Sequence, residues 1–439
     1  MSYKFKDYRF YLDYLIETGV FYSNNHYEPN ISSVKYRYSN LYYNDNPVAY
    51  CIDKPIKYQT KEQIINQRVH EEMASYLYHW YKQNGLKIDY KTALKYVYDM
   101  KELKMKRLID WDRNANTGKK KYPVQQYHSA IINIQSIGEH DYNAHKDDNI
   151  HRLHSRLTSL QKECRNFVSY SNENLVSIDI KNSQPYLANV LFNPSFWDKN
   201  DCNSFCLYDL PKNIQDLILK QYQSPTLPDK IKGYLKKINI EEVSEYQKLT
   251  SQGKMYEEIM KVAEIRTGQK IERKDAKTMM FIVFFSQNKF QRWLKKFFTK
   301  LYPNIYGLFE MIKEKNHATL ACLLQAIESE IILNRCCQRI WEKGNHQIPI
   351  FTIHDSIITT VENQDLVRRI MEETLSKCIG VKPALEIEAW HESNLKKEKN
   401  LPVLYDNSIN QVELNKNSTN KLNFSSNEQR NDKQSRYFL

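Results

Sequence analysis

The sequence contains no apolar run of about 18 residues or more, so it predicts no membrane-spanning helix. Its first residues, MSYKFKDYRFYLDYL, alternate charged and aromatic side chains and lack both the apolar core and the cleavage site of a secretory signal. The eight cysteines are scattered along 439 residues, which favours reduced thiols over a disulfide framework. We therefore expect a soluble, cytoplasmic protein that makes no membrane contact.

Glycine is scarce, with 10 residues, whereas tyrosine contributes 32. Lysine and arginine number 64 against 52 acidic residues, a formal net charge of +12. A basic chain is compatible with a nucleic-acid partner, but biased codon usage produces the same composition, so the charge alone does not decide between them. Hydrophobic residues make up 41% of the chain, which excludes a wholly disordered protein. The length allows two or three domains.

Both ends of the chain differ in character from its middle. Residues 5–17 predict an amphipathic helix, and two aromatic-rich stretches at 20–27 and 33–43 predict a hairpin. Helix and hairpin together form either a small α+β cap or part of a winged-helix module that binds duplex. Residues 396–439 are polar and rich in asparagine, which predicts a disordered tail.

Residues 61–112 predict two helices broken at Gly85, and the second of these is strongly basic. Three consecutive lysines follow at 119–121. Such a basic pair of helices either tracks a phosphate backbone or presents an ordinary solvated face.

Residues 174–192, NLVSIDIKNSQPYLANVLF, begin with an alternating strand pattern that ends on an acid. Ser183 and Pro185 are a typical helix start, with serine at the cap and proline in the first turn. Asp179 is thus expected at the end of a strand, where its carboxylate can enter a cleft and bind a hard cation.

Residues 268–290 predict a helix on which Arg273, Lys277, Phe281 and Phe285 recur every four residues. Each step of four turns the helix by only about 40° from a full repeat, so the four side chains share one stripe. Two cations followed by two aromatics suit a helix that binds a triphosphate and stacks a base. The same pattern fits an amphipathic helix whose cationic end is exposed.

Residues 347–363, QIPIFTIHDSIITTVEN, predict two strands joined at His354, Asp355 and Ser356. Pairing this hairpin beside the strand of Asp179 would bring two carboxylates together. Facing carboxylates are unfavourable unless cations neutralise them, and two Mg²⁺ ions are the usual solution.

The order of these three segments resembles the motifs of family A DNA polymerases and of the related single-subunit phage-type RNA polymerases. Residues 154–168, HSRLTSLQKECRNFV, resemble the segment before the first palm motif, and 323–334, LLQAIESEIILN, resemble the glutamine-bearing helix before the hairpin. A helix and a strand after the hairpin resemble the family's ending, so the resemblance covers about 154–392.

The resemblance implies a right-hand polymerase of the α+β class, with an antiparallel-sheet palm and helical fingers and thumb. It implies an N-terminal cap at 1–60, a thumb-like region at 61–153, palm segments at 154–199 and 315–395, fingers at 200–314 and the tail at 396–439. The first 153 residues leave no room for a proofreading exonuclease of the family's usual size.

The resemblance also implies roles for individual residues. Asp179, Asp355 and the Ile180 carbonyl would bind two Mg²⁺ ions, for which Mn²⁺ can substitute. The nucleotide would contact Arg273, Lys277, Phe281, Phe285 and Gln184, and the template–primer would contact Arg156, Gln325 and His354. A primer 3′-hydroxyl would attack the α-phosphate, and metals and positioning would supply the catalysis.

Several residues depart from the family pattern. Gln184 stands where DNA polymerases carry the glutamate that blocks a ribose 2′-hydroxyl, although an alignment slip of one would put Ser183 there. Phe285 and Ser286 replace the common tyrosine and glycine. Ser356 replaces the second acid and gives H-D-S, as in the RNA polymerases. The bulk of Gln184 favours deoxynucleotides, yet the choice of sugar stays open.

The first interpretation is therefore an exonuclease-less DNA polymerase from a phage or mobile element. We expect it to act as a monomer on a DNA template–primer. An RNA template and replication accessory proteins are further partners that this interpretation allows. The second is an RNA polymerase or primase on the same fold, and the third is a polymerase-like protein that binds nucleic acid without synthesis. A metal phosphohydrolase built on His354 and Asp355 would need further ligands on helices, whereas the sequence predicts strands. A zinc site at Cys202 and Cys206 is not expected, because no second ligand pair lies nearby.

Overall fold

The computed structural model describes residues 8–24, 36–39, 74–114, 118–200, 204–268, 270–290 and 292–397. The chain divides into two compact units. One comprises Met1–Ile65 with Val403–Leu439, and the other comprises Asn66–Pro402.

The first unit contains a helix followed by a two-stranded antiparallel sheet. Helix α1 (Tyr8–Glu17) precedes strands β1 (Phe21–Ser23) and β2 (Tyr36–Tyr38). The rings of Phe21 and Tyr38 face each other across the pair, with centroids 4.9 Å apart. Helix and hairpin occur where the sequence predicts them, but the rest of the expected cap and nearly all of the expected tail lie outside the described residues.

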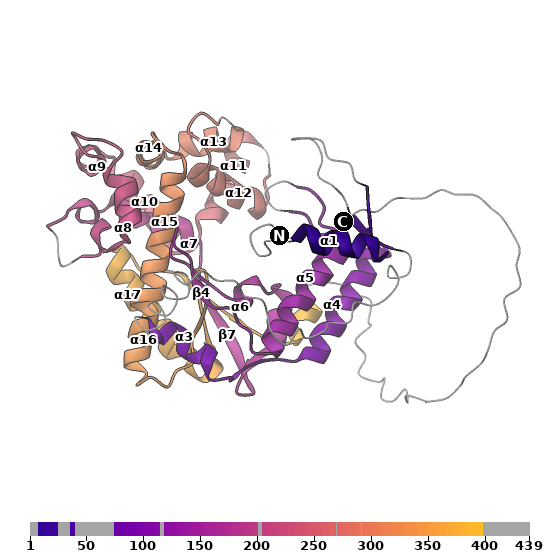
Figure 1. The fold of residues 1–439 in the computed structure, drawn as a ribbon. Coiled ribbons are helices and arrows are strands. Elements are labelled where there is room, and N and C mark those ends of the chain that lie inside the picture. Colours follow the sequence, from indigo (N-terminus) through magenta and orange to yellow (C-terminus); the bar gives the residue numbers. More distant parts are fainter. Residues whose placement is uncertain are drawn as a thin grey trace, which may run out of the picture. The chain divides into compact units, whose positions relative to one another are not determined.

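The second unit is built on a six-stranded antiparallel sheet (Figure 1). The strand order is β3-β6-β7-β9-β8, and β10 pairs with β7 beyond the end of β6. This confirms the α+β class with an antiparallel sheet. The strands are β3 (Leu86–Ile88), β6 (Val168–Tyr170), β7 (Glu173–Ile180), β8 (Phe351–Ile353), β9 (Ser356–Thr360) and β10 (Leu385–Ala389).

The central strand is β7, which carries the alternating run of the LVSID segment. Ile178 lies opposite Ile357 of β9, and Asp179 lies opposite Glu386 of β10. The side chains of 175–178 are buried, because β7 has neighbouring strands on both sides and helices pack on the sheet. The strand therefore holds its last residues in a fixed position.

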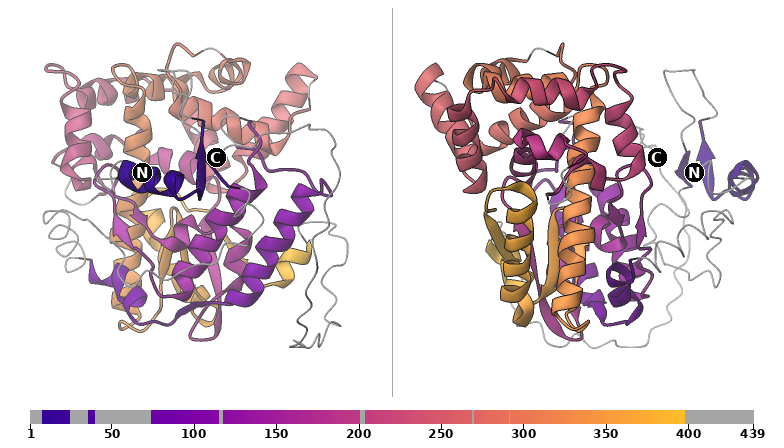
Figure 2. Two further views of the ribbon diagram at one scale, coloured as in Figure 1. Left: turned by 45° about the vertical axis from the view of Figure 1, so that its right-hand side comes forward. Right: turned by 90° about the vertical axis from the view of Figure 1, so that its left-hand side faces the viewer.

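One continuous helical column and a helix that lies alongside it support this sheet. The column consists of α15 (Ala318–Ser329), the π-helical segment η5 (Glu330–Cys337) and α16 (Gln338–Lys343). Helix α17 (Gln364–Ile379) packs against η5 and also contacts β7 and β9. Figure 2 shows α17 alongside the column.

A group of helices gathers at one end of the second unit, around α8 to α14 (Figure 1). Large buried side chains, among them Trp197, Tyr246, Phe284 and Phe309, form its core. Its elements are α7 (Ser183–Leu187), η2 (Ala188–Phe192), η3 (Pro194–Trp197), η4 (Leu207–Asp209), α8 (Lys212–Leu219), α9 (Leu227–Leu235), α10 (Ile240–Ser251), α11 (Met255–Thr267), α12 (Arg273–Phe285), α13 (Trp293–Leu301) and α14 (Pro303–Ile312).

Helices α3 (Ser75–Lys82) and α4 (Tyr90–Met105) correct the prediction for the region before the sheet. The sequence predicted two helices separated only by a break at Gly85, but β3 lies between them and joins the sheet. A Cβ atom at Gly85 would lie 2.5 Å from the ring of Tyr170, so glycine permits this close pairing with β6. A three-residue strand leaves too short a pattern to be recognised in the sequence.

The remaining elements connect these parts. Helix α5 packs along α4, and both are visible beside the sheet in Figure 1. The elements are α5 (Pro123–Gly138), β4 (His145–Lys146), β5 (Leu153–His154), α6 (Arg156–Ser159), η1 (Glu163–Phe167), η6 (Val361–Asn363) and α18 (Ser393–Lys397).

Candidate active site

The end of β7 and the β8–β9 turn bring two carboxylates together. Asp179 is the next-to-last residue of β7, and Asp355 lies in the turn that precedes β9. Because β9 pairs with β7, Ser356 reaches Asp179, and its hydroxyl donates a hydrogen bond to Asp179 Oδ1. The Ser177 hydroxyl donates to the same oxygen at 3.1 Å.

The buried position of both acids, and the charge of Asp355 on Asp179, perturb their ionisation. Burial, followed by the charge of Asp355, raises the pKa of Asp179 from 3.8 to about 6. Burial also raises the pKa of Asp355. Acids in this state favour a bound cation, because a divalent ion stabilises both ionised forms at once.

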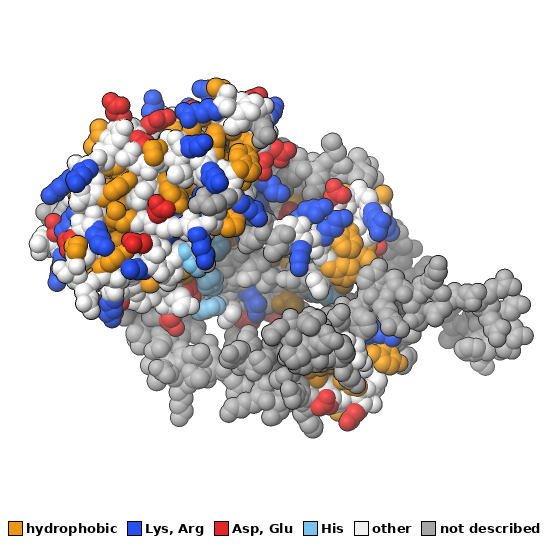
Figure 3. Space-filling model, turned by 90° about the horizontal axis from the view of Figure 1, so that it is seen from above, with side chains coloured by type: hydrophobic (Ala, Val, Ile, Leu, Met, Phe, Trp, Pro, Cys, Tyr) orange, Lys and Arg blue, Asp and Glu red, His pale blue; other side chains and the backbone are white. Residues whose placement is uncertain are grey.

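His354 shapes the turn that presents Asp355. Its backbone lies in the left-handed region, with φ at 55°. Reduced hydration and the nearby cations Arg152 and Arg165, together with His154, lower the pKa of this exposed imidazole to about 4, so it is neutral at pH 7. The ring of His154 also lies 5.8 Å from that of His145. Figure 3 shows histidine side chains gathered on one surface, with lysine and arginine around them.

Three cations act on the carboxylates. The Arg165 guanidinium lowers the pKa of Asp179, while Arg152 and Lys277 lower that of Asp355. Sequence reasoning identified Lys277 but missed the two arginines. Their signal was weak, since both flank Arg156 in a stretch whose partners lie far away in the chain.

Helix α12 carries the expected stripe on one side. Its start is fixed by a capping box between Glu272 and Asp275. The rings of Phe281 and Phe285 are 5.3 Å apart, and the Lys277 ammonium lies 6.0 Å from the Phe281 centroid. The helix therefore places a cation beside two neighbouring aromatic rings.

Arg273 contacts the preceding helix α11 in this structure. Its Nε donates to Glu257 at 3.0 Å, and its guanidinium lies 5.1 Å from the Tyr256 ring centroid. Burial raises the pKa of Tyr256 to about 12, with Arg273 and Asp355 acting in opposite directions. Tyr256 thus lies within electrostatic range of both the arginine and the acid.

Two buried lysines hold the end of α12, and sequence reasoning missed both. The Lys313 ammonium donates to the Val283 carbonyl at 2.5 Å, and the Lys295 ammonium donates to the Gln287 carbonyl at 2.6 Å. Burial lowers the pKa of Lys313 to about 7, with Lys295 adding to the effect. The Lys313 bond satisfies a carbonyl in the last turn of α12, and the Lys295 bond holds the segment directly after it, so together they fix the aromatic end of the stripe.

Helix α7 begins one residue earlier than the sequence predicted. Ser183 is its first residue, and the cap is Asn182, whose backbone is left-handed at φ 53°. Asparagine tolerates this conformation better than most residues, which explains the shift. Gln184 then lies in the first turn, where its amide donates to Glu328 of α15 at 2.7 Å.

Glu328 is a functional candidate that sequence reasoning missed. It is 2% exposed, and its second oxygen accepts a hydrogen bond from Arg152 at 2.6 Å. Burial raises its pKa to about 7, against the opposing charge of Arg152. An acid inside the apolar run LLQAIESEIIL was an available signal, because a buried carboxylate requires partners.

The remaining predicted residues lie on separate elements. Arg156 is the first residue of α6, held by the Ser155 cap, and its guanidinium lies 3.9 Å from Asp141. Gln325 is half-buried on α15, one turn before Glu328. Ile180 ends β7 directly after Asp179. The structure gives neither Arg156 nor Gln325 a contact with the paired carboxylates.

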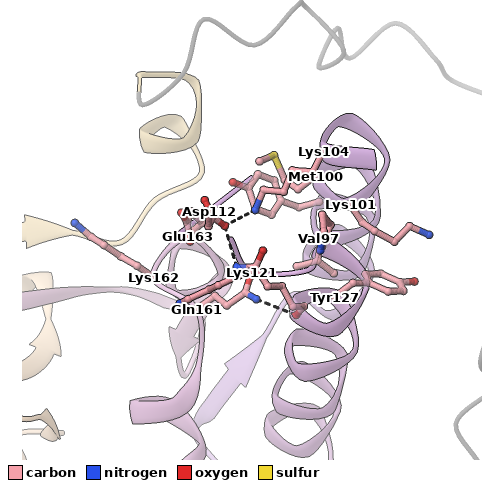
Figure 4. Close-up of a pocket in the computed structure, with 13 residues that line it drawn as sticks. Val97, Met100, Lys101, Lys104, Asp112, Lys121, Tyr127, Gln161, Lys162 and Glu163 are labelled. Atoms are coloured by element: carbon pink, nitrogen blue, oxygen red, sulfur yellow. Dashed lines mark hydrogen bonds and ion pairs between the residues drawn. The ribbon is translucent and has the colours of Figure 1, made fainter. Parts of the chain in front are cut away.

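A pocket of about 280 Å³ lies between α4, the start of α5 and η1, away from the carboxylates. Figure 4 shows Lys104 bonded to Asp112 inside it, while Lys101 and Lys162 extend away. The Lys104–Asp112 distance is 2.5 Å, and Gln126 donates to the same acid. This pair, in which Lys104 is buried and Asp112 is exposed, holds the loop after α4 against α5.

The donor set at the carboxylates suits magnesium better than zinc. Among the described residues there is no group of three or more His, Cys, Asp or Glu side chains arranged to hold a metal. Magnesium is commonly bound through one or two carboxylates, with water and substrate phosphates completing its shell. Asp179 and Asp355 fit this requirement.

Comparison with known proteins gives little further guidance. No family model matches the chain, and no curated protein matches it. Among solved structures, it is similar to one described as the POL domain of Pol1 from M. smegmatis in complex with DNA primer-template and dNTP. The sequence identity is 9%, the alignment covers 76% of this chain and 73% of that one, and the TM-score is 0.32. A TM-score this low does not establish a common fold, so function must be inferred from the site.

No helix in the part of the chain that the structure describes is both long and apolar enough to cross a membrane.

Proposed function

We propose that this chain extends a primer 3′-end with nucleoside triphosphates on a nucleic-acid template, as a DNA polymerase of the family A type. The observation that carries the proposal is the convergence of Asp179, at the end of β7, and Asp355, in the turn before the adjoining strand β9, with Lys277 of α12 acting on Asp355. Paired carboxylates beside a helix of cations and aromatics suit the transfer of a nucleotide from a triphosphate.

In this proposal the sheet is the palm, the group of helices around α8 to α14 is the fingers and the α4–α5 pair belongs to the thumb. The palm supplies rigid positions for the acids, because β7 is paired on both sides. The fingers carry the stripe of α12, whose aromatic end is fixed by Lys295 and Lys313. This division supports a nucleotide site between α12 and the carboxylates.

Asp179, Asp355 and the Ile180 carbonyl would hold two Mg²⁺ ions. Bound there, the ions would lower the pKa of the primer 3′-hydroxyl and neutralise charge that develops on the phosphates. Arg273 would leave Glu257 to bind the β- and γ-phosphates together with Lys277, since a triphosphate carries more negative charge than one exposed carboxylate and also accepts bidentate hydrogen bonds.

Neighbouring residues would orient the other parts of the substrate. Phe281 and Phe285 offer a surface for the sugar and base, and the neutral His354 imidazole can hydrogen-bond the primer end. Arg156 and Gln325 would contact the duplex in its minor groove. Gln184 would fill the space beside C2′ of the sugar, which favours deoxynucleotides.

Two alternatives have different support. An RNA polymerase of the same type would also use the paired acids, and its H-D-S turn is present. A metal phosphohydrolase built on His354 is disfavoured, because the described residues offer no third acidic or imidazole ligand.

Primer extension tests the proposal directly. Purified chain is incubated with a labelled primer on a DNA or an RNA template, with dNTPs or NTPs, and with Mg²⁺ or Mn²⁺. We expect metal-dependent, template-directed addition of deoxynucleotides. Exclusive use of NTPs would replace the DNA polymerase by the RNA polymerase, and no addition under any combination would overturn the proposal.

A further inference from the structure

The cavity between α4, the start of α5 and η1 has no part in the proposed reaction. Its volume is about 280 Å³, and it shares no lining residue with the paired acids. Part of its wall is apolar, because Val97 and Met100 of α4 and Pro123 of α5 are buried there. The volume is near the lower end of the range for small-molecule sites, so the cavity suits a small ligand with an apolar face.

Lysine side chains dominate the charge around this cavity. Four of its lining residues are lysines and two are acids, namely Lys101, Lys104, Lys121 and Lys162 against Asp112 and Glu163. Lys104 is already paired with Asp112. Lys121 is exposed, and its ammonium has no ion pair among the residues that the structure describes. The lining therefore carries an excess of positive charge that favours an anionic ligand.

Two of these lysines have only weak competing partners. Lys101 lies 3.1 Å from Glu102, and Lys162 lies 3.0 Å from Glu388, both in partly exposed ion pairs. Such pairs contribute little in water, so a phosphate can displace them. Figure 4 shows the two lysines extending in opposite directions from the cavity, and their flexible stems allow each to turn toward a bound anion.

Tyr127 places an aromatic ring beside the cations. It lines the cavity, and the Lys101 ammonium lies 4.8 Å from the centroid of its ring. The same ammonium lies 4.4 Å from the ring of Tyr98, which is 41% exposed. A cation next to an aromatic surface matches the two ends of a nucleotide, because the phosphate pairs with the cation and the base stacks on the ring.

A basic segment begins at the edge of the same cavity. The backbone N–H of Lys121 donates to the Asp112 carbonyl at 2.7 Å, and Arg113 pairs with Lys120 through the backbone. These bonds hold the lysines of 119–121, whose role the sequence left open, next to the cavity. A nucleic-acid strand that leaves the cavity would therefore meet further positive charge.

We propose that this cavity binds a single nucleotide, either free or within a single strand, with its base against Tyr127 and its phosphate on Lys101 and Lys121. When the nucleotide belongs to a strand, Lys119 and Lys120 contact the neighbouring phosphates. The site is separate from the paired acids and does not require that the chain polymerises nucleotides.

Binding is measured on the full chain in EDTA, so that the paired acids hold no divalent ion. A Lys277→Ala background also removes the lysine expected to hold a nucleotide on α12. Saturation-transfer NMR with dAMP reports contact between the protein and the adenine protons. Fluorescence anisotropy with a short labelled single-stranded oligo-dA reports binding of a nucleotide within a strand. We expect binding in at least one of the two assays.

Variants of the lining locate that binding. Lys121→Gln should weaken it about five- to ten-fold, because it removes a charge-assisted hydrogen bond to phosphate. Tyr127→Leu should weaken it by a similar factor through loss of stacking, whereas Tyr127→Phe keeps the ring and should bind normally. Lys220→Gln is the matched control, since it removes an exposed lysine of α8 and should leave binding unchanged.

Each result supports or overturns the inference. Binding of dAMP assigns the site to free nucleotides, and binding of the oligonucleotide alone assigns it to a strand. Unchanged affinity in both Lys121→Gln and Tyr127→Leu would overturn the inference. Competition by inorganic phosphate without any signal from the adenine protons would also overturn it, because the site would then hold an anion and no base.

Two further measurements keep these results separate from folding and from catalysis. Thermal unfolding identifies a misfolded variant, and Lys121 is exposed, so its replacement leaves the core intact. Primer extension tests the proposed function independently, and its failure would leave this nucleotide site standing.

Discussion

The pairing of Asp179 with Asp355 has a consequence for stability that does not depend on catalysis. Without a cation, Asp179 has a pKa of about 6 in the folded chain, compared with its ordinary value of 3.8, which applies to the unfolded chain. The folded state therefore binds the proton more tightly than the unfolded state does. The contribution of protonated Asp179 to the stability of the folded chain is fully present below about pH 4 and is lost as the pH rises through about 6. The difference corresponds to about 3 kcal/mol, since one pKa unit is about 1.4 kcal/mol.

Asp355→Asn removes the charge of the second carboxylate, and with it both its repulsion of Asp179 and its own cost of burial. Burial is the larger cause and Asp355 the second, so the substitution should return about 1 kcal/mol at pH 8 without divalent ions. The gain should shrink at pH 4, where Asp179 is protonated in both proteins. Magnesium should stabilise the wild-type chain at pH 8 and should stabilise the variant less, because one of the two carboxylates is missing.

Urea unfolding at pH 4 and pH 8, with EDTA or with Mg²⁺, measures these differences. The control is Asp216→Asn, which removes a surface acid of α8 that pairs with Lys212 and Lys220 and should not gain stability at pH 8. Equal stability of Asp355→Asn and wild type at both pH values, with the same response to Mg²⁺, would refute the electrostatic reasoning. It would mean that the two acids do not repel each other.

Three further predictions concern nucleotide and nucleic-acid binding. Lys277→Ala should reduce kcat/KM for the nucleotide by about ten- to hundred-fold, mainly through KM, as expected for a lost charge-assisted hydrogen bond; an unchanged steady-state profile would make the stripe of α12 structural. Gln184→Gly should raise ribonucleotide incorporation by about ten-fold in competition assays, because it removes bulk beside C2′; no rise would assign the gate to another residue. Duplex affinity should fall about a thousand-fold between about 50 and 200 mM salt if six phosphates are contacted, as measured by fluorescence anisotropy; a flat response would contradict a phosphate-tracking surface.

Local sequence patterns predicted the elements that carry the paired acids. The alternation in LVSID predicts a strand that ends near Asp179, and two β-rich runs around H-D-S predict the turn that contains Asp355. These patterns arise within a few residues, so they are readable without knowing the fold. The pairing of the hairpin beside the strand of Asp179 was itself an assumption, from which the meeting of the two acids followed.

The hydrogen-bond partners of the buried acid Glu328 could not be predicted in the same way. Arg152 and Glu328 are 176 residues apart, and Gln184 and Glu328 are 144 apart. No local periodicity connects such positions, because the contact depends on how α15 packs against α7 and the sheet. The same limit applies to Lys295 and Lys313, whose partners are backbone carbonyls that carry no sequence signal.

Single-turnover primer extension by Asp179→Asn and Asp355→Asn tests the central claim most directly. Both substitutions keep the shape of the side chain and remove its charge, so the folded chain should still bind template–primer with near wild-type affinity. The account predicts that either change reduces nucleotide addition to background in the presence of Mg²⁺. Nucleotide addition by either variant at a rate close to wild type would contradict a metal-binding role for these two acids.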